Sequence, residues 1–127
     1  MNYLPKNILV TGAAGFIGCN YARYVLAADD SVKIVSLDNL SYAGTLKNLE
    51  NLPAPERHHF VEGDICDKEL VLTLLRDFKI DTIVHFAAES HVDRSITGPA
   101  AFIQSNIVGT FSLLEAAREA WLNEKCG

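Results

Sequence analysis

Three glycines at regular spacing are the residues of this sequence with the clearest chemical meaning. Gly12, Gly15 and Gly18 follow the apolar run Ile8–Val10 and open an amphipathic segment, which predicts a strand, a tight turn and a helix. Gly12 permits the turn, Gly15 lets the backbone approach a phosphate, and Gly18 lets the helix lie against the strand. The helix start then offers N–H groups to an anion. The pattern predicts a dinucleotide pyrophosphate site, although a glycine trio also occurs in ordinary turns.

A carboxylate at the end of the second apolar run adds to this prediction. Asp38 lies 20 residues after Gly18, where it can accept hydrogen bonds from the hydroxyls of an adenosine ribose. The alternative is a helix cap or a solvated turn residue. A 2′-phosphate beside Asp38 would meet a like charge, at a cost of roughly 1 kcal/mol in water and about 4 kcal/mol at intermediate dielectric for ~4 Å. No arginine is adjacent, so the sequence favours NAD over NADP.

Two later segments are candidates for the rest of a dinucleotide site. Asp64 and Ile65 follow the third apolar run, where they could hold adenine or simply form a turn and a helix cap. The segment 86–95 follows the fourth run. Its two alanines leave room for a ligand, and Ser90 is a good hydrogen-bond donor to a substrate or a ribose. Ser105 lies in an apolar helical stretch, where its hydroxyl can also bond back to its own helix.

Composition limits the classes of function. The chain has 127 residues, a net charge of −5 and no basic run, so we expect one domain that binds neither nucleic acid nor an anionic membrane. No apolar stretch reaches the roughly 20 residues of a membrane span, and the first residues have no secretory signal core. Three scattered cysteines favour a reducing cytoplasm. The four histidines lack metal-site spacing, so no metal is expected.

The elements that must position these residues alternate along the chain. We predict strands at 8–10, 33–38, 60–61 and 82–88, a short helix near 46–49, and helices after the first, third and fourth strands. Asp67 is the expected cap of the helix whose apolar face comprises Leu70, Val71, Leu74, Leu75 and Phe78. The expected apolar face of the first helix comprises Ile17, Tyr21, Tyr24, Val25 and Ala28.

This alternation predicts an α/β fold with a Rossmann-like, doubly wound parallel sheet of strand order 3-2-1-4. A ligand crevice then lies at the carboxyl ends of strands one and four. A long helix is expected to begin at Gly98–Pro99. Its apolar surface is wide enough to lie between the sheet and another subunit, and it includes Ile103, Ile107, Phe111 and Leu114. We expect one domain over 1–127, truncated before a fifth strand.

Four segments together resemble the extended short-chain dehydrogenase/reductase family, and within it most closely its dTDP-glucose 4,6-dehydratase branch. They are Thr11–Gly18 (TGAAGFIG), Leu37–Gly44 (LDNLSYAG), Gly63–Asp67 (GDICD) and, most specifically, His85–Thr110. The resemblance covers nearly the whole chain apart from the first residues and the stretch around Glu50–Arg57. It implies NAD as cofactor, dTDP-glucose or another nucleotide sugar as substrate, and a homodimer for the full-length enzyme.

The resemblance also assigns residues to the site. It implies contact with the sugar nucleotide for Ser90 and contact with NAD for Gly12, Gly15, Phe16, Ile17, Gly18, Asp38, Asn39, Leu40, Ser41, Asp64, Ile65, Phe86, Ala87, Ala88, Glu89, Ser90 and Ser105. The chain departs from the usual residues at four positions, which are Ala13 for glycine, Asn39 for lysine, Phe86 for leucine and Ser105 for threonine. Asn39 removes a cation near the ribose.

The family reaction oxidises the sugar at C4, eliminates water across C5 and C6, and reduces C6 with the stored hydride. It uses a Tyr-x-x-x-Lys pair and a Thr-Asp-Glu segment, neither of which occurs in this sequence. General acid–base groups each contribute roughly 10²–10⁴-fold, so we assign no catalytic residue and expect the isolated chain to be inactive. The alternatives are another nucleotide-sugar epimerase or dehydratase of the family, or a non-catalytic NAD-binding sensor.

Overall fold

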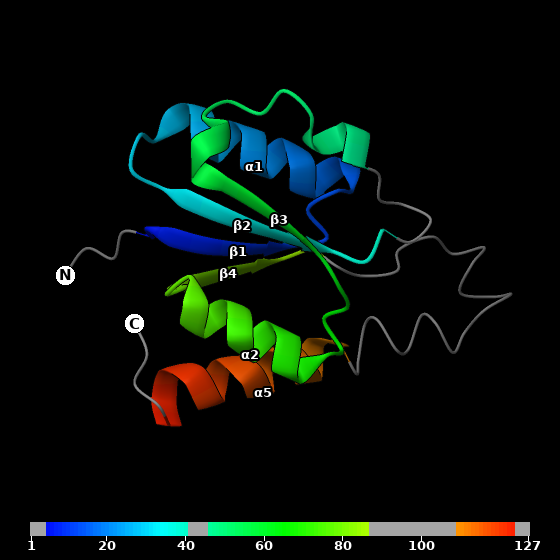
Figure 1. The fold of residues 1–127 in the computed structure, drawn as a ribbon, viewed down its shortest axis with the longest axis vertical. Helices are drawn as coiled ribbons and strands as arrows, with labels where there is room; N and C mark the ends of the chain where they lie inside the picture. Colours follow the sequence, from blue (N-terminus) through cyan, green and yellow to red (C-terminus); the bar gives the residue numbers. More distant parts are fainter. Residues whose placement is uncertain (1–4, 41–45, 87–108, 124–127) are drawn as a thin grey trace, which may run out of the picture.

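The computed structural model describes residues 5–40, 46–86 and 109–123. Its centre is a four-stranded parallel sheet in the order β3-β2-β1-β4, which confirms the predicted topology. The strands are β1 (Asn7–Thr11), β2 (Lys33–Asp38), β3 (His58–Glu62) and β4 (Thr82–His85). Figure 1 shows α1 (Phe16–Ala28) on one face of the sheet, and α2 (Lys68–Asp77) and α5 (Gly109–Arg118) on the other.

The sheet divides the apolar core into two clusters because side chains alternate along a strand. Ile8 and Val10 of β1 pack on the side of α1, together with Ile34 of β2. Leu9 and Val35 pack on the side of α2 and α5. Both faces of the inner strands are therefore covered, as their continuous apolar sequence requires.

The predicted fourth strand included Phe86, which the structure places after the strand, and its last two residues, Ala87 and Ala88, lie outside the described residues. β4 ends at His85, which pairs with Thr11, the last residue of β1. Gly12 then turns away with a φ of 66°, so no strand remains beside Phe86 to continue the ladder. The first strand is one residue longer at each end than predicted, and the third covers five residues rather than two.

The predicted apolar face of α1 is only partly buried, because Tyr21 and Val25 pack against the core whereas Ile17, Tyr24 and Ala28 are exposed. Ile17 and Tyr24 are 65% and 73% exposed, and the buried residues of α1 are Gly18, Cys19, Ala22 and Leu26. The reason lies at Gly18, where an added Cβ would collide with the Gly12 carbonyl and approach the Ala13 Cα to 2.8 Å. The helix must turn its smallest residues toward the backbone that it crosses, and this contact overrides the hydrophobic pattern.

The helices on the other face bear on two predictions. The Asp67 side chain accepts a hydrogen bond from Leu70 N–H at 3.2 Å, so it caps α2 as predicted. In α5, however, Leu113 is buried whereas Phe111 and Leu114 are more than 60% exposed. The predicted stripe thus faces outward over its described part, because small residues such as Ala116 make the close contact with α2 and the sheet.

Shorter helical turns complete the described chain. The predicted helix near 46–49 is present as the 3-10 turn η1 (Leu46–Leu49), and a second 3-10 turn, η2 (Pro55–Arg57), precedes β3. A π-helical turn, η4 (Glu119–Asn123), extends α5. Among the described residues, no helix is long and apolar enough to cross a bilayer.

Candidate functional site

The glycine turn joins the carboxyl end of β1 to the amino end of α1. Gly12 N–H donates to the Leu37 carbonyl of β2 at 2.9 Å, and Gly15 N–H closes the turn on the Gly12 carbonyl at 3.2 Å. The left-handed φ of Gly12 is one that other residues rarely adopt. The turn therefore lies at the edge of the sheet where the strand order reverses, which is where a parallel sheet of this kind binds ligands.

The two remaining glycines have different surroundings. A side chain at Gly18 would overlap backbone atoms, so this glycine serves the packing of α1 on β1. At Gly15 an added Cβ would have an ordinary 3.4 Å contact with the Gly12 carbonyl oxygen, and its φ of −78° is open to any residue. The fold itself thus does not require glycine at position 15. The space beside it is what a phosphate group at this turn would use.

The start of α1 can receive an anion. Gly15 is the residue before the first helical turn, and no side chain caps the helix there. The first N–H groups of the helix and the positive end of its dipole are then available to a phosphate. Phe16 is 78% exposed beside them, and Ile17 is exposed as well. Their exposure fits the predicted contact with a pyrophosphate.

Asp38 lies where the sequence predicted it, at the end of β2 beside the glycine turn. It is 8% exposed. One carboxylate oxygen, Oδ2, accepts Ala14 N–H at 2.9 Å, and the other, Oδ1, accepts Leu40 N–H at 2.8 Å. Each oxygen can accept more than one hydrogen bond, so these contacts orient the carboxylate and leave it able to accept from a ribose hydroxyl. Asp38 is therefore neither a helix cap nor a solvated turn residue, which were the alternatives left open by the sequence.

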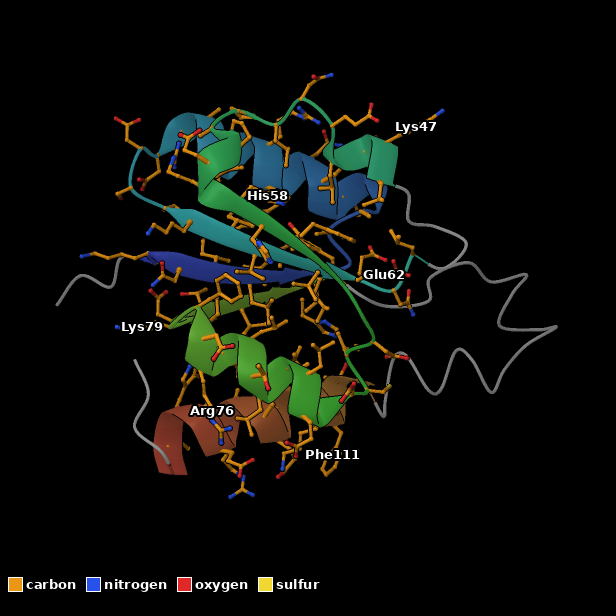
Figure 2. All side chains as sticks on the ribbon, in the orientation of Figure 1. Lys47, His58, Glu62, Arg76, Lys79 and Phe111 are labelled. Carbon is orange, nitrogen blue, oxygen red and sulfur yellow. The ribbon has the colours of Figure 1, made fainter. Side chains whose placement is uncertain are left out.

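The residues after Asp38 are shaped by the same carboxylate. Leu40 is half-buried and has a φ of 56°, a left-handed conformation that its hydrogen bond to Asp38 supports. Asn39 is exposed at the same edge. Glu62 pairs with Asp38 in the sheet and is exposed at the carboxyl end of β3 (Figure 2). This acidic edge would repel a 2′-phosphate more strongly than Asp38 alone.

Asp64 and Ile65 follow β3 on the same edge of the sheet. The Asp64 side chain is exposed and accepts Cys66 N–H at 2.8 Å through Oδ1. Ile65 is buried in the cluster below the sheet. Gly63 N–H donates to the Asp38 carbonyl at 3.1 Å, which links this segment to the ribose end of the site. The predicted adenine contact therefore has the right position, and it stays a prediction.

Phe86 lies next to the glycine turn, but it is also part of the packing. Its ring centroid is 5.6 Å from that of Tyr21 on α1, and its N–H donates to the carbonyl of Thr11 at 3.0 Å. Six other predicted site residues lie outside the described part of the chain. They are Ser41, Ala87, Ala88, Glu89, Ser90 and Ser105.

A polar chain that the sequence analysis missed runs through the end of β4. The His85 Nδ1 atom lies 2.7 Å from Thr11 Oγ1, and its Nε2 atom lies 3.0 Å from Thr110 Oγ1 on α5. Thr11 Oγ1 also accepts Phe86 N–H at 3.1 Å. Burial lowers the pKa of His85 below its usual value, so the neutral ring joins β1, β4 and α5. These contacts tie the end of β4 to β1 and α5 next to the glycine turn.

Comparison with known proteins assigns the chain to a family. A family model described as GDP-mannose 4,6 dehydratase matches residues 9–127. The chain belongs to this family. Among curated members, the dTDP-glucose 4,6-dehydratase of Xanthomonas campestris is 53% identical over 113 residues, which is 89% of this chain and 32% of that enzyme. The dTDP-glucose 4,6-dehydratase of Salmonella typhimurium is 47% identical over 90% of this chain and 31% of that enzyme.

Solved structures agree with this assignment to the 4,6-dehydratase family. DesIV, the dTDP-glucose 4,6-dehydratase of Streptomyces venezuelae solved with NAD bound, is 46% identical with a TM-score of 0.81, over 87% of this chain and 35% of that one. UDP-glucose 4-epimerase from Brucella ovis, also in complex with NAD, is 34% identical with a TM-score of 0.76, over 89% of this chain and 32% of that one. The chain thus spans about a third of the length of these relatives.

Two further residues were missed by the sequence analysis, because no motif or spacing in the sequence indicates their role. Asn48 of η1 donates from Nδ2 to the Ala14 carbonyl of the glycine turn at 2.6 Å. Arg23 of α1 holds the backbone of η1 in turn. An asparagine within a long connection looks like any loop residue. Only the tertiary structure brings it to a turn that lies 34 residues earlier in the sequence.

Proposed function

We propose that this chain binds NAD as the cofactor-binding part of a dTDP-glucose 4,6-dehydratase that converts dTDP-glucose to dTDP-4-keto-6-deoxyglucose in deoxysugar biosynthesis. The observation that carries the proposal is the pairing of Asp38 with the glycine turn, in which Ala14 N–H donates to Asp38 Oδ2. This contact supports the proposal because it brings a carboxylate and an uncapped helix start together, which is the arrangement that a dinucleotide needs. Over the part that aligns, the dTDP-glucose dehydratases cited above are 47% and 53% identical to the chain.

In this proposal each described residue has a binding role. Asp38 accepts hydrogen bonds from the adenosine ribose, the start of α1 faces the pyrophosphate, and Gly15 leaves room for it. Asp64 and Ile65 lie on the adenine side, and Phe86 on the nicotinamide side. NAD would supply the oxidation of the sugar at C4 and the later reduction at C6. The acidic edge formed by Asp38 and Glu62 favours NAD over its 2′-phosphorylated form.

The substrate and the partners are part of the same proposal. We propose dTDP-glucose, or another nucleotide sugar, with Ser90 among its contacts, and a cytoplasmic homodimer for the whole enzyme. The exposed apolar residues of α5 support an interface with a second copy. Acid–base residues are not assigned here, because the sequence holds neither Tyr-x-x-x-Lys nor Thr-Asp-Glu. The chain alone is therefore expected to bind the cofactor without turnover.

A second candidate function is that of a nucleotide-sugar 4-epimerase. Its support is the epimerase structure at 34% identity and a TM-score of 0.76. The dehydratase candidate has the stronger support, since DesIV is 46% identical over a similar share of the chain.

Titration calorimetry of the purified chain with NAD and NADP tests the proposal. We expect NAD to bind and NADP to bind at least about tenfold more weakly. The Asp38→Ala variant should bind NAD more weakly and should show a smaller difference in affinity between NAD and NADP. The loss of a hydrogen bond to a charged group, about 1.5–3 kcal/mol, corresponds to about ten- to 150-fold in affinity. An absence of NAD binding, or an equal affinity for the two cofactors, would contradict the proposal. Formation of a 4-keto-6-deoxy sugar by the chain alone would contradict the expected lack of turnover.

A further inference from the structure

Ala14 at the centre of the glycine turn is held from two directions. Its N–H donates to Asp38 Oδ2 at 2.9 Å, and its carbonyl accepts Asn48 Nδ2 at 2.6 Å. These two groups belong to consecutive peptide units, because the N–H lies in the unit before the Cα and the carbonyl lies in the unit after it. A residue of β2 thus fixes one unit of the turn, and a residue of η1 fixes the next.

The second of these units directly precedes α1. It carries the Ala14 carbonyl and the Gly15 N–H, which point in opposite directions in a planar trans peptide. Asn48 holds the carbonyl end, and the Gly12 carbonyl holds the N–H end at 3.2 Å. A rotation of this unit would break both hydrogen bonds and turn the Ala14 carbonyl oxygen toward the Gly12 carbonyl oxygen, which now accepts the Gly15 N–H. Two facing carbonyl oxygens repel each other and would change the shape of the turn that leads into α1, where a phosphate would bind.

Asn48 is itself fixed by α1. The Arg23 guanidinium donates to the backbone carbonyls of Asn48 at 3.2 Å, Glu50 at 3.3 Å and Asn51 at 2.9 Å. Leu52 anchors the following residues in the apolar cluster under α1. These contacts connect three neighbouring segments. Arg23 of α1 holds η1, Asn48 of η1 holds the glycine turn, and the turn leads into α1. Because these contacts hold the backbone at Asn48, only the freedom of the Asn48 side chain itself is lost when its hydrogen bond forms.

We propose that Asn48 is a positioning residue of the dinucleotide site. Through the Ala14 carbonyl it keeps the glycine turn in the conformation that receives a pyrophosphate, and Arg23 keeps Asn48 in place. The inference rests on the proposed binding of a dinucleotide at this turn. It predicts that Asn48 strengthens the binding only of ligands that carry the phosphates, whereas Asp38 strengthens the binding of ligands that carry the ribose.

The test compares three ligands in Asn48→Ala by titration calorimetry and, for the weakest ligand, by competition. NAD and ADP carry a pyrophosphate, and adenosine does not. Loss of one hydrogen bond predicts about three- to tenfold weaker binding of NAD and ADP, with adenosine unchanged. The Asn48→Asp variant keeps the shape of the side chain but removes its N–H donor. It should therefore weaken the binding of NAD and ADP at least as much as Asn48→Ala does.

The matched control is Asn7→Ala. The Asn7 Nδ2 atom also donates to a backbone carbonyl, that of Lys79 at 3.1 Å, but it does so at the opposite end of β1. This variant should leave all three affinities unchanged. Thermal unfolding of each variant shows whether the fold has been affected.

The outcomes separate the inference from the proposed function. If Asn48→Ala binds NAD and ADP as tightly as the unsubstituted chain, the inference is wrong and the proposed function stands. If all three ligands weaken equally, Asn48 acts on the fold alone and the inference is again wrong. If the unsubstituted chain binds neither NAD nor ADP, the proposed function fails and the inference fails with it.

Discussion

His85 shows how a single side chain ties the end of β4 to the rest of the site. Its ring lies between Thr11 of β1 and Thr110 of α5 and is half-buried. Burial lowers its pKa, and burial together with the nearby His59 lowers the pKa of His58. In both cases the folded state prefers the neutral ring more strongly than the unfolded chain does.

This preference predicts a pH dependence of stability. Below the ordinary pKa of 6.5, the unfolded chain binds more protons than the folded one, so the free energy of unfolding falls as the pH falls. Above that value the effect is absent. Urea unfolding at pH 7.5, 6.5 and 5.5 should show this decline, and His85→Gln should reduce its slope while lowering stability by about 1 kcal/mol at pH 7.5. The remaining slope belongs to His58. Identical slopes in the two proteins would show that His85 does not contribute.

At the scale of elements, the contact between α1 and β1 separates the roles of two glycines. Gly18→Ala should reduce the free energy of unfolding by about 2–3 kcal/mol, because its Cβ would overlap the backbone of the glycine turn. Gly15→Ala has space in the fold and should cost only about 1 kcal/mol or less. Its methyl group occupies the space proposed for a phosphate, however, so NAD binding should weaken by about tenfold or more.

Chemical unfolding and NAD calorimetry on both variants check this separation. The expected pattern is an unstable Gly18→Ala and a stable Gly15→Ala that binds NAD poorly. A Gly15→Ala variant that binds NAD as well as the unsubstituted chain would place the pyrophosphate elsewhere. A Gly18→Ala variant as stable as the unsubstituted chain would mean that α1 can shift away from β1 at little cost.

These elements also show what could be predicted from the sequence. The strand order follows from the alternation of apolar runs and amphipathic segments, and the site of Asp38 follows from its place at a strand end. The rotation of α1 could not be predicted from its apolar residues, because the close approach at Gly18 decides it. Asn48 could not be predicted either, since its role depends on where a long connection returns to the turn.

Two arginines illustrate the same limit. Arg57 of η2 donates to the carbonyls of Leu26, Asp29 and Val32 at 2.6–2.9 Å and so caps the end of α1. Arg23 does the same for η1. Both satisfy backbone groups that a helix leaves without partners. Sequence rules find caps supplied by neighbouring residues, such as Asp67, and they miss caps supplied from a distance.

For the whole molecule, the question is what covers the outer face of α5. Phe111 and Leu114 of α5 are 63% and 65% exposed, and Leu122 of η4, which extends α5, is 70% exposed. Figure 2 shows Phe111 on the side of α5 that is turned away from the sheet. A surface of this kind is typical of an interface between subunits. Among the described strands, β4 pairs only with β1, and pairing along an open strand edge would be a second route to association.

A charge on α5 distinguishes these two routes. Burial of one leucine is worth about 1.5–3 kcal/mol, so Leu114→Glu should weaken self-association by about tenfold or more if α5 forms the interface. Tyr24→Glu is the matched control, because Tyr24 is 73% exposed on α1, across the sheet from α5. Sedimentation velocity over a range of concentrations measures both. A chain that stays monomeric would contradict the prediction. Association that persists in Leu114→Glu would favour pairing along the edge of β4, because that contact needs backbone groups and not the leucine side chain.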